Sequence, residues 1–291
     1  KVMMQRFEEV REWKFTDKEL SRPRKLLIGA CFTSEYALEC AALFNPSIVP
    51  HPDQSDLPEG SLRFIMSLRA VGEGHVSSVV FRSGTIDAGH HIELTPPSPI
   101  VTSPGRHPTA RYDKDRFAEK LFEIGVEDEC TQRVLDLLAD SFTLTELEKA
   151  LQDLGECEPR FARTHQFTRE NMLYLAMSNY DVQFVPDIPI SAKVIFPHSP
   201  SETNGIEDAR FVRFEEGEGK YTYYATYTAW NGRTIFPQLL STDDFSHFRV
   251  RTLSGNAVEN KGFALFPKRI GGQYAMLSRQ DGENIFLMYS G

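Results

Sequence analysis

One pattern of two strands joined by a turn occurs three times in this chain, and it constrains the fold more than any other feature. Each copy opens on polar residues, continues as an apolar strand, turns, and returns as a strand that ends on a polar residue. The copies run over residues 45–69, 207–228 and 260–279. A period of roughly 50 residues is typical of the blades of a β-propeller. The sequence therefore predicts a mainly β fold of the propeller type.

The repeat also predicts which polar residues meet. An antiparallel hairpin brings its first and last residues to the same end. If the hairpins surround one axis, these ends line one pocket that holds a carboxylic acid and several cations, which suits a polar substrate and an anion. The predicted neighbours are Asn45 with Arg69, Asp208 and Arg210 with Thr228, and Lys261 with Arg279.

Charge and hydropathy exclude several classes of function. The net charge of −9 argues against a nucleic-acid partner and offers no basic surface to anionic lipid. No apolar run approaches the ~20 residues of a transmembrane helix, and residues 1–14 are too charged for a secretory signal. We expect a cytoplasmic protein without a membrane partner.

The cysteines do not have the spacing of a zinc site or of a dense disulfide framework. We interpret all of them as reduced thiols, in keeping with a cytoplasmic location, and expect no metal and no cofactor. The four cysteines are Cys31, Cys40, Cys130 and Cys157.

A change of periodicity predicts the organisation of the chain. Between about residues 113 and 180 the apolar residues follow helical spacing, and Thr143 with Glu146 has the form of a capping box. We interpret 113–180 as a helical insertion. The predicted β-propeller catalytic domain comprises residues 25–112 and 181–291, and residues 1–24 are a terminal extension.

The expected elements within this division are mostly strands. Lys25–Ala30 is expected as a strand and Glu35–Leu43 as a short helix. About three blades can be counted, whereas a propeller generally needs about four or more. Either the chain is a fragment of a longer protein or the count is wrong. The strands expected after the insertion are 211–214, 221–228, 235–240, 248–253, 263–266, 273–277 and 284–289.

A set of motifs in a fixed order resembles glycoside hydrolase family 130, which contains β-mannoside phosphorylases and related β-mannosidases on a five-bladed propeller. The resemblance covers roughly residues 25–110 and 190–291. The motifs are Phe44-Asn45-Pro46-Ser47, Leu68-Arg69-Ala70, Gly205-Ile206-Glu207-Asp208-Ala209-Arg210, Tyr224-Ala225-Thr226-Tyr227-Thr228-Ala229, Asn260-Lys261, Leu265-Phe266-Pro267 and Met276-Leu277-Ser278-Arg279.

The resemblance implies roles for individual residues. It makes Asp208 the proton donor, with the proton passing through a sugar hydroxyl, and makes phosphate the nucleophile. It places Asn45 and Arg69 on the substrate and Lys261 and Arg279 on phosphate. Ala209 and Ser278 stand where the family commonly has proline and histidine.

The resulting hypothesis is an inverting phosphorylase that cleaves β-linked manno-oligosaccharides to α-mannose 1-phosphate. Asp208 is its general acid, Asn45, Arg69 and Arg210 bind substrate, and inorganic phosphate is the co-substrate. Two alternatives stay open: a β-mannosidase that uses water, and a non-catalytic carbohydrate-binding or scaffold propeller. A homo-oligomer is compatible with either.

Structural explanations compete with these roles. Asp208 and Arg210 could form an ordinary salt bridge at a strand end, and Asn45 before Pro46 is first of all a turn signal. His75 is a secondary candidate in a loop near Arg69. The pair at residues 90 and 91 does not suit one metal ion, because adjacent strand residues point to opposite faces.

Overall fold

The computed structural model describes residues 2–11, 18–33, 35–107, 111–153 and 162–290. Its first sheet is a meander of four antiparallel strands, to which a fifth strand from later in the chain is added. Strand β9 pairs with β3 and so ties the segment before the second hairpin to the first sheet. The members are β1 (Ala42–Pro50), β2 (Leu62–Val71), β3 (Ser77–Ile86), β4 (Ile92–Leu94) and β9 (Val194–Ile195).

The second sheet contains the four consecutive strands that the sequence predicts after the insertion. They pair in chain order, and two earlier strands extend the edge beyond β13. A turn with positive φ at Gly217, Glu218 and Gly219 joins the first two strands, a conformation that glycine adopts without steric cost. The strand order is β10 (Ile206–Gly217), β11 (Lys220–Trp230), β12 (Ile235–Thr242), β13 (His247–Thr252), β8 (Tyr180–Gln183) and β5 (Gly105–His107).

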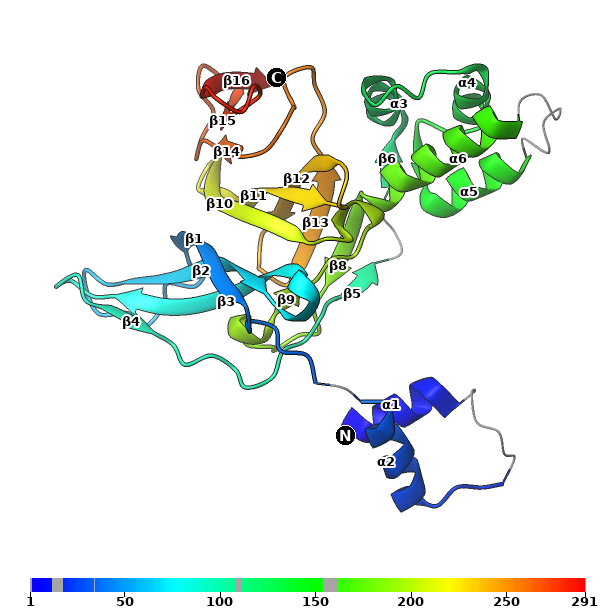
Figure 1. Ribbon diagram of the computed structural model, residues 1–291. Coiled ribbons are helices and arrows are strands. Elements are labelled where there is room, and N and C mark those ends of the chain that lie inside the picture. Colours follow the sequence, from blue (N-terminus) through cyan, green and yellow to red (C-terminus); the bar gives the residue numbers. More distant parts are fainter. Residues whose placement is uncertain (1, 12–17, 34, 108–110, 154–161, 291) are drawn as a thin grey trace.

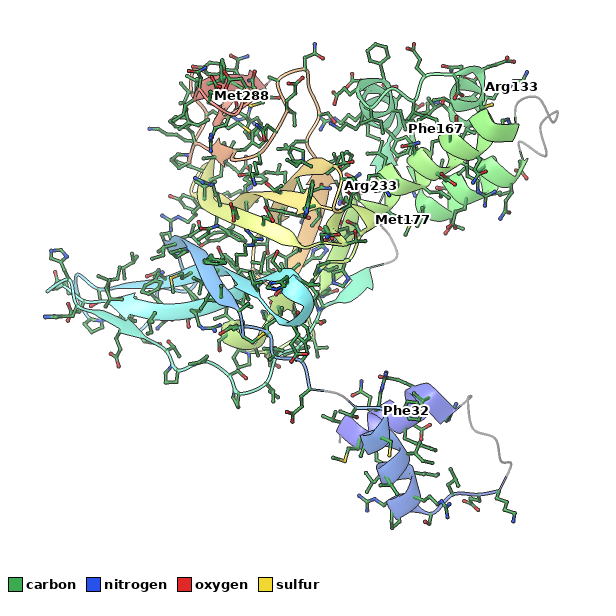
Figure 2. All side chains as sticks on the ribbon, in the orientation of Figure 1. Phe32, Arg133, Phe167, Met177, Arg233 and Met288 are labelled. Atoms are coloured by element: carbon green, nitrogen blue, oxygen red, sulfur yellow. The ribbon has the colours of Figure 1, made fainter. Side chains whose placement is uncertain are left out.

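The third sheet is small and confirms the strands expected in the last copy of the repeat. It orders β14 (Ala264–Leu265), β15 (Tyr274–Ser278) and β16 (Phe286–Ser290) side by side. The described residues therefore establish a mainly β fold of antiparallel sheets, and Figure 1 shows no closed ring of blades among them. The five-bladed propeller stays a prediction.

Helices occupy the middle of the chain where the sequence takes on helical spacing. They gather beside the six-stranded sheet, together with a two-stranded ribbon (Figure 1). Strand β8 begins at Tyr180, next to the predicted boundary at 181. The elements are β6 (Arg111–Asp113), α3 (Lys114–Glu123), α4 (Glu129–Asp136), β7 (Ser141–Thr143), α5 (Leu144–Asp153) and α6 (Ala162–Met177).

The capping box predicted at Thr143 and Glu146 is confirmed. The Thr143 backbone N–H donates to Glu146 Oε2 at 2.7 Å, and the Glu146 N–H donates to Thr143 Oγ1 at 3.3 Å. These two bonds satisfy donors that the first turn of α5 would otherwise leave unpaired. The chain therefore begins α5 where the sequence places it.

Two expectations for the N-terminal region are wrong. Residues 25–30, expected as a strand, lie within α2 (Arg22–Cys31), so the predicted domain boundary at 25 falls inside a helix. A short apolar run does not distinguish a buried strand from a helix by its period. Residues 35–41 are not helical, and β1 already begins at Ala42.

The helix at residues 25–30 packs closely on the helix that precedes it. Helix α2 packs on α1 (Val2–Val10), and the two helices lie apart from the sheets in Figure 1. A Cβ atom on Gly29 would lie 1.7 Å from the Met3 carbonyl oxygen, so the missing side chain lets the helices cross closely. Pro23 stands in the first turn of α2, where its missing N–H costs nothing. None of the described helices is both long enough and apolar enough to cross a membrane.

A buried carboxylate joins the second sheet to the loop that precedes it. Glu202 is fully buried, and its Oε1 accepts hydrogen bonds from the hydroxyls of Tyr180 at 2.9 Å and Tyr227 at 2.5 Å. Its Oε2 accepts from the backbone N–H groups of His198 at 2.8 Å and Ser199 at 3.0 Å. The loop before β10 is therefore fixed to β8 and β11 by one side chain.

This arrangement predicts that stability depends on pH in alkaline solution. Burial, and then the charge of Glu202, raise the pKa of Tyr227 well above its ordinary value. In the unfolded chain this tyrosine ionises near pH ~10, while the folded protein keeps its proton. Above that pH the unfolded state binds fewer protons, so its population grows and the free energy of unfolding falls.

Urea unfolding between pH 9 and 11.5 tests this effect. Tyr227→Phe should make the decline of the unfolding free energy shallower, by up to about 1.4 kcal/mol per pH unit. Tyr223 and Tyr224, whose pKa values burial also raises, keep part of the slope in the variant. Equal slopes for the two proteins would contradict the role of Tyr227.

Candidate active site

Each copy of the repeat has a residue with left-handed backbone geometry at its first or second position. The φ angles are 49° at Asn45, 56° at Asp208 and 64° at Asn260. Asparagine and aspartate adopt this region more readily than other residues with a Cβ atom. In the first two copies the residue lies within a register shift, between Phe44 and Ser47 in β1 and between Glu207 and Arg210 in β10. The repeat predicted from the sequence is thus also a repeat of backbone conformation.

The bulges of β1 and β10 meet each other. The Asn45 Nδ2 donates a hydrogen bond to Asp208 Oδ1. Two residues beyond Asn45 and three beyond Asp208, Ser47 Oγ accepts from the Phe211 backbone N–H at 2.8 Å. These bonds fix the relative position of the first two hairpins, whose strands pack on each other through this region.

Two cations complete the group around Asp208. Arg69 lies in β2 next to the β1 bulge, in register with Phe44. Its Nη2 donates to Glu207 Oε1 at 2.8 Å, and its Nη1 lies 3.6 Å from Asp208 Oδ1. Lys261, from the segment before β14, places Nζ 3.7 Å from Glu207 Oε2. We call Asn45, Arg69, Glu207, Asp208 and Lys261 the Asp208 cluster; all three hairpins contribute to it.

The bulge explains how two adjacent carboxylates reach one cation. Successive side chains of a regular strand point to opposite faces. The register shift and the positive φ of Asp208 break this alternation, so Glu207 and Asp208 both approach Arg69. The Asp208 side chain is 33% exposed and that of Lys261 is 52% exposed. The cluster is therefore accessible to a ligand.

Two of the residues predicted for the site lie outside the cluster. Arg210 is exposed and has no ion pair in the part of the chain that the structure describes. The alternative explanation, a salt bridge between Asp208 and Arg210, is therefore wrong, because Asp208 faces Asn45 and Arg69 instead. Arg279 donates from Nη2 to the Gly282 carbonyl oxygen at 2.8 Å, and its Cδ lies 3.4 Å from where a Cβ on Gly262 would stand. Arg279 thus lies beside Gly262, the residue that follows Lys261 in the chain.

Glu207 is the member of the cluster that the sequence analysis did not place among the predicted site residues. The sequence marks it as a neighbour of Asp208 in the Glu207-Asp208 pair. Its two ion pairs depend on the bulge and on the approach of the third hairpin. The sequence alone shows neither the bulge at Asp208 nor the cations that pair with Glu207.

The remaining candidates show ordinary structural roles. His75 is exposed at the end of a short turn, with φ of 58°. His91 Nδ1 lies 3.2 Å from Asp87 Oδ2 in an exposed loop. Among the described residues there is no group of three His, Cys, Asp or Glu that could hold a metal ion. Cys31 and Cys40 are exposed free thiols and Cys130 is buried, and the fourth cysteine, at position 157, lies outside the described residues.

Comparison of sequences finds a relative among characterised enzymes. No family model matches the chain. The chain is 31% identical over 93 residues to a β-1,2-mannobiose phosphorylase of Listeria innocua, and the match covers 31% of this chain and 24% of that enzyme. The chain thus spans about a quarter of the length of this relative.

Comparison of structures finds proteins that are described as mannoside-active enzymes, among them the following two. One is described as belonging to the GH130 family of mannoside phosphorylases, which contains glycoside hydrolases that target β-1,2 mannosidic linkages in Candida mannan. Its sequence is 13% identical, the match covers 85% of this chain and 46% of that protein's chain, and the TM-score is 0.34. A second is the Listeria innocua β-1,2-mannobiose phosphorylase with β-1,2-mannobiose, at 17% identity, 84% and 57% coverage and a TM-score of 0.27. The similarity in sequence to a mannobiose phosphorylase thus extends over 93 residues of the chain.

Proposed function

We propose that this chain belongs to an enzyme that cleaves β-mannosidic bonds by inverting phosphorolysis and yields α-mannose 1-phosphate. The observation that carries the proposal is the Asp208 cluster, in which the accessible Asp208 carboxyl group faces an amide and a guanidinium while the adjacent Glu207 faces an ammonium from the third hairpin. The mannobiose phosphorylase among the relatives supports the choice of substrate class. β-Linked manno-oligosaccharides and inorganic phosphate are the proposed substrates.

The proposed reaction gives separate roles to the residues that hold the sugar and to those that hold the phosphate. Asp208 supplies the proton that neutralises the leaving oxygen, through a hydroxyl group of the sugar, while Asn45 and Arg69 hold the sugar beside it. A phosphate oxygen bonds to C1 from the opposite face as the glycosidic bond breaks, which inverts the configuration at C1. Lys261 and Arg279 bind and orient the phosphate, since an anionic nucleophile needs cations to position it.

The same proposal extends to the fold. Three hairpins that open on residues of the same backbone geometry contribute to one cluster. This is the arrangement that blades around a common axis produce. We therefore propose that the sheets are part of a five-bladed propeller whose axis passes near Asp208.

Hydrolysis is the second candidate, and the contacts of Glu207 argue against it. A water nucleophile needs a carboxylate base on the face of the sugar opposite the acid. Glu207 is the neighbouring carboxylate, but both of its oxygens face cations, Arg69 at 2.8 Å and Lys261 at 3.7 Å. It also lies beside Asp208 rather than across from it. A phosphate nucleophile does not need such a base.

Turnover of a panel of β-manno-disaccharides at increasing phosphate concentration tests the proposal. We expect the rate to rise from near zero to a plateau with phosphate. Lys261→Ala should raise the KM for phosphate by about tenfold, because it removes one charged hydrogen-bond donor. Lys220→Ala, at an exposed lysine in β11, is the matched control and should leave it unchanged.

The other outcomes have definite meanings. Release of free mannose at a rate independent of phosphate would favour the hydrolase and remove the phosphate role of Lys261. Sugar binding without cleavage of any linkage would favour the non-catalytic binding protein.

A further inference from the structure

We propose that Glu207 is a positioning residue that holds the Arg69 guanidinium to itself and so keeps Asp208 free to carry a proton. The inference rests on the proposed function, in which Asp208 is the general acid. It assigns to Glu207 a role that differs from that of a second catalytic carboxylate.

The distances show which carboxylate Arg69 prefers. Arg69 Nη2 makes a hydrogen bond of 2.8 Å to Glu207 Oε1, whereas Nη1 lies 3.6 Å from Asp208 Oδ1, beyond hydrogen-bond distance. Both side chains of the shorter pair are mostly buried, with 22% exposure for Arg69 and 17% for Glu207. Charge-assisted bonds in such surroundings are roughly twice as strong as neutral ones. Arg69 therefore interacts more strongly with Glu207 than with Asp208.

The groups around Asp208 explain why the pairing of Arg69 with Glu207 matters. Among the described residues, Asp208 faces Asn45 from β1 and Arg69 from β2, and Glu207 precedes it in β10. Lys261, the other cation of the cluster, lies against Glu207. Arg69 is thus the cation that approaches Asp208, and Asn45 is a neutral donor.

Removal of the Glu207 charge frees Arg69 to pair with Asp208. An arginine can bind one carboxylate through two parallel N–H groups. Such a pair favours the ionised form of the carboxylate. An ionised Asp208 cannot donate the proton that the leaving oxygen needs, so the acid would be present in a smaller fraction of molecules at neutral pH.

The experiment is a carboxyl carbon-13 NMR titration of the wild type and of Glu207→Gln, with the Asp208 signal assigned through Asp208→Asn. We expect the midpoint of the Asp208 titration to move to lower pH by about one unit in Glu207→Gln. Glu207→Asp keeps the charge and should restore most of the wild-type midpoint. Glu215→Gln, at an exposed glutamate of the same strand, should leave it in place.

Kinetics separate positioning from a general structural defect. In Glu207→Gln the alkaline limb of the kcat profile should move by the same amount, so kcat falls about tenfold at pH 8 and recovers in acid. An unchanged Asp208 midpoint, or a midpoint moved to higher pH, would overturn the inference. The NMR result does not require turnover, so an inactive wild type would refute the proposed function and still leave the arrangement of Glu207, Arg69 and Asp208 tested.

Discussion

Asp208→Asn should lower kcat for β-mannoside phosphorolysis by about a thousandfold, since a general acid contributes roughly 10²–10⁴-fold to such a reaction. The amide keeps the oxygen that accepts the Asn45 hydrogen bond, so the two bulges should stay in contact. It has no proton to give to the leaving oxygen. We therefore expect the dissociation constant for a manno-disaccharide, measured by calorimetry, to change by less than about threefold.

A matched control separates loss of the acid from loss of a charge. Asp140→Asn changes a fully exposed aspartate beside Lys114, far in the sequence from the repeated hairpins, and should leave kcat and binding unchanged. Sugar binding lost together with turnover in Asp208→Asn would indicate a binding role for the residue. Turnover within about tenfold of the wild type would remove Asp208 from its proposed place as the general acid.

Glu202→Ala should destabilise the protein by about 3–5 kcal/mol, the cost of removing one partner from a buried charged network. The substitution removes the acceptor of four hydrogen bonds, which the hydroxyls of Tyr180 and Tyr227 and the N–H groups of His198 and Ser199 donate. Each such group costs about 1–3 kcal/mol when it stays unsatisfied. Urea unfolding at pH 7, followed by tryptophan fluorescence, measures the change.

The loss of unfolding free energy distinguishes the hydrogen bonds of Glu202 from the packing of its side chain. Glu202→Gln keeps the volume and one acceptor oxygen, so it should cost less than Glu202→Ala. Glu148→Ala, at an exposed position of α5, is the control and should change the unfolding free energy by less than about 0.5 kcal/mol. A cost below about 1 kcal/mol for Glu202→Ala would show that the network contributes little to stability.

The polar ends of the repeat were predictable because a hairpin fixes which residues are neighbours. The prediction that Asn45 lies next to Arg69 follows from antiparallel pairing, and the register places Arg69 opposite Phe44. The four strands after the insertion were likewise visible as apolar segments between turns, and they pair in the expected order. The convergence of Asn45, Arg69, Asp208 and Lys261 follows from the same repeat.

The features that were not predictable depend on contacts between distant segments. Lys25–Ala30 lies in helix α2, and Gly29 lets this helix pack closely on α1, a contact that no local pattern reveals. The ion pairs of Glu207 require a bulge and the third hairpin. Arg210 matched the pattern as well as Arg69 did, yet the backbone at the bulge leaves it exposed.

Proton NMR of β-1,2-mannobiose incubated with the protein, with and without inorganic phosphate, tests the central claim most directly. The account predicts that α-mannose 1-phosphate is the first sugar phosphate to form, and that neither it nor free mannose accumulates without phosphate. Free mannose formed at the same rate in both samples, or β-mannose 1-phosphate as the first product, would contradict inverting phosphorolysis at the Asp208 cluster.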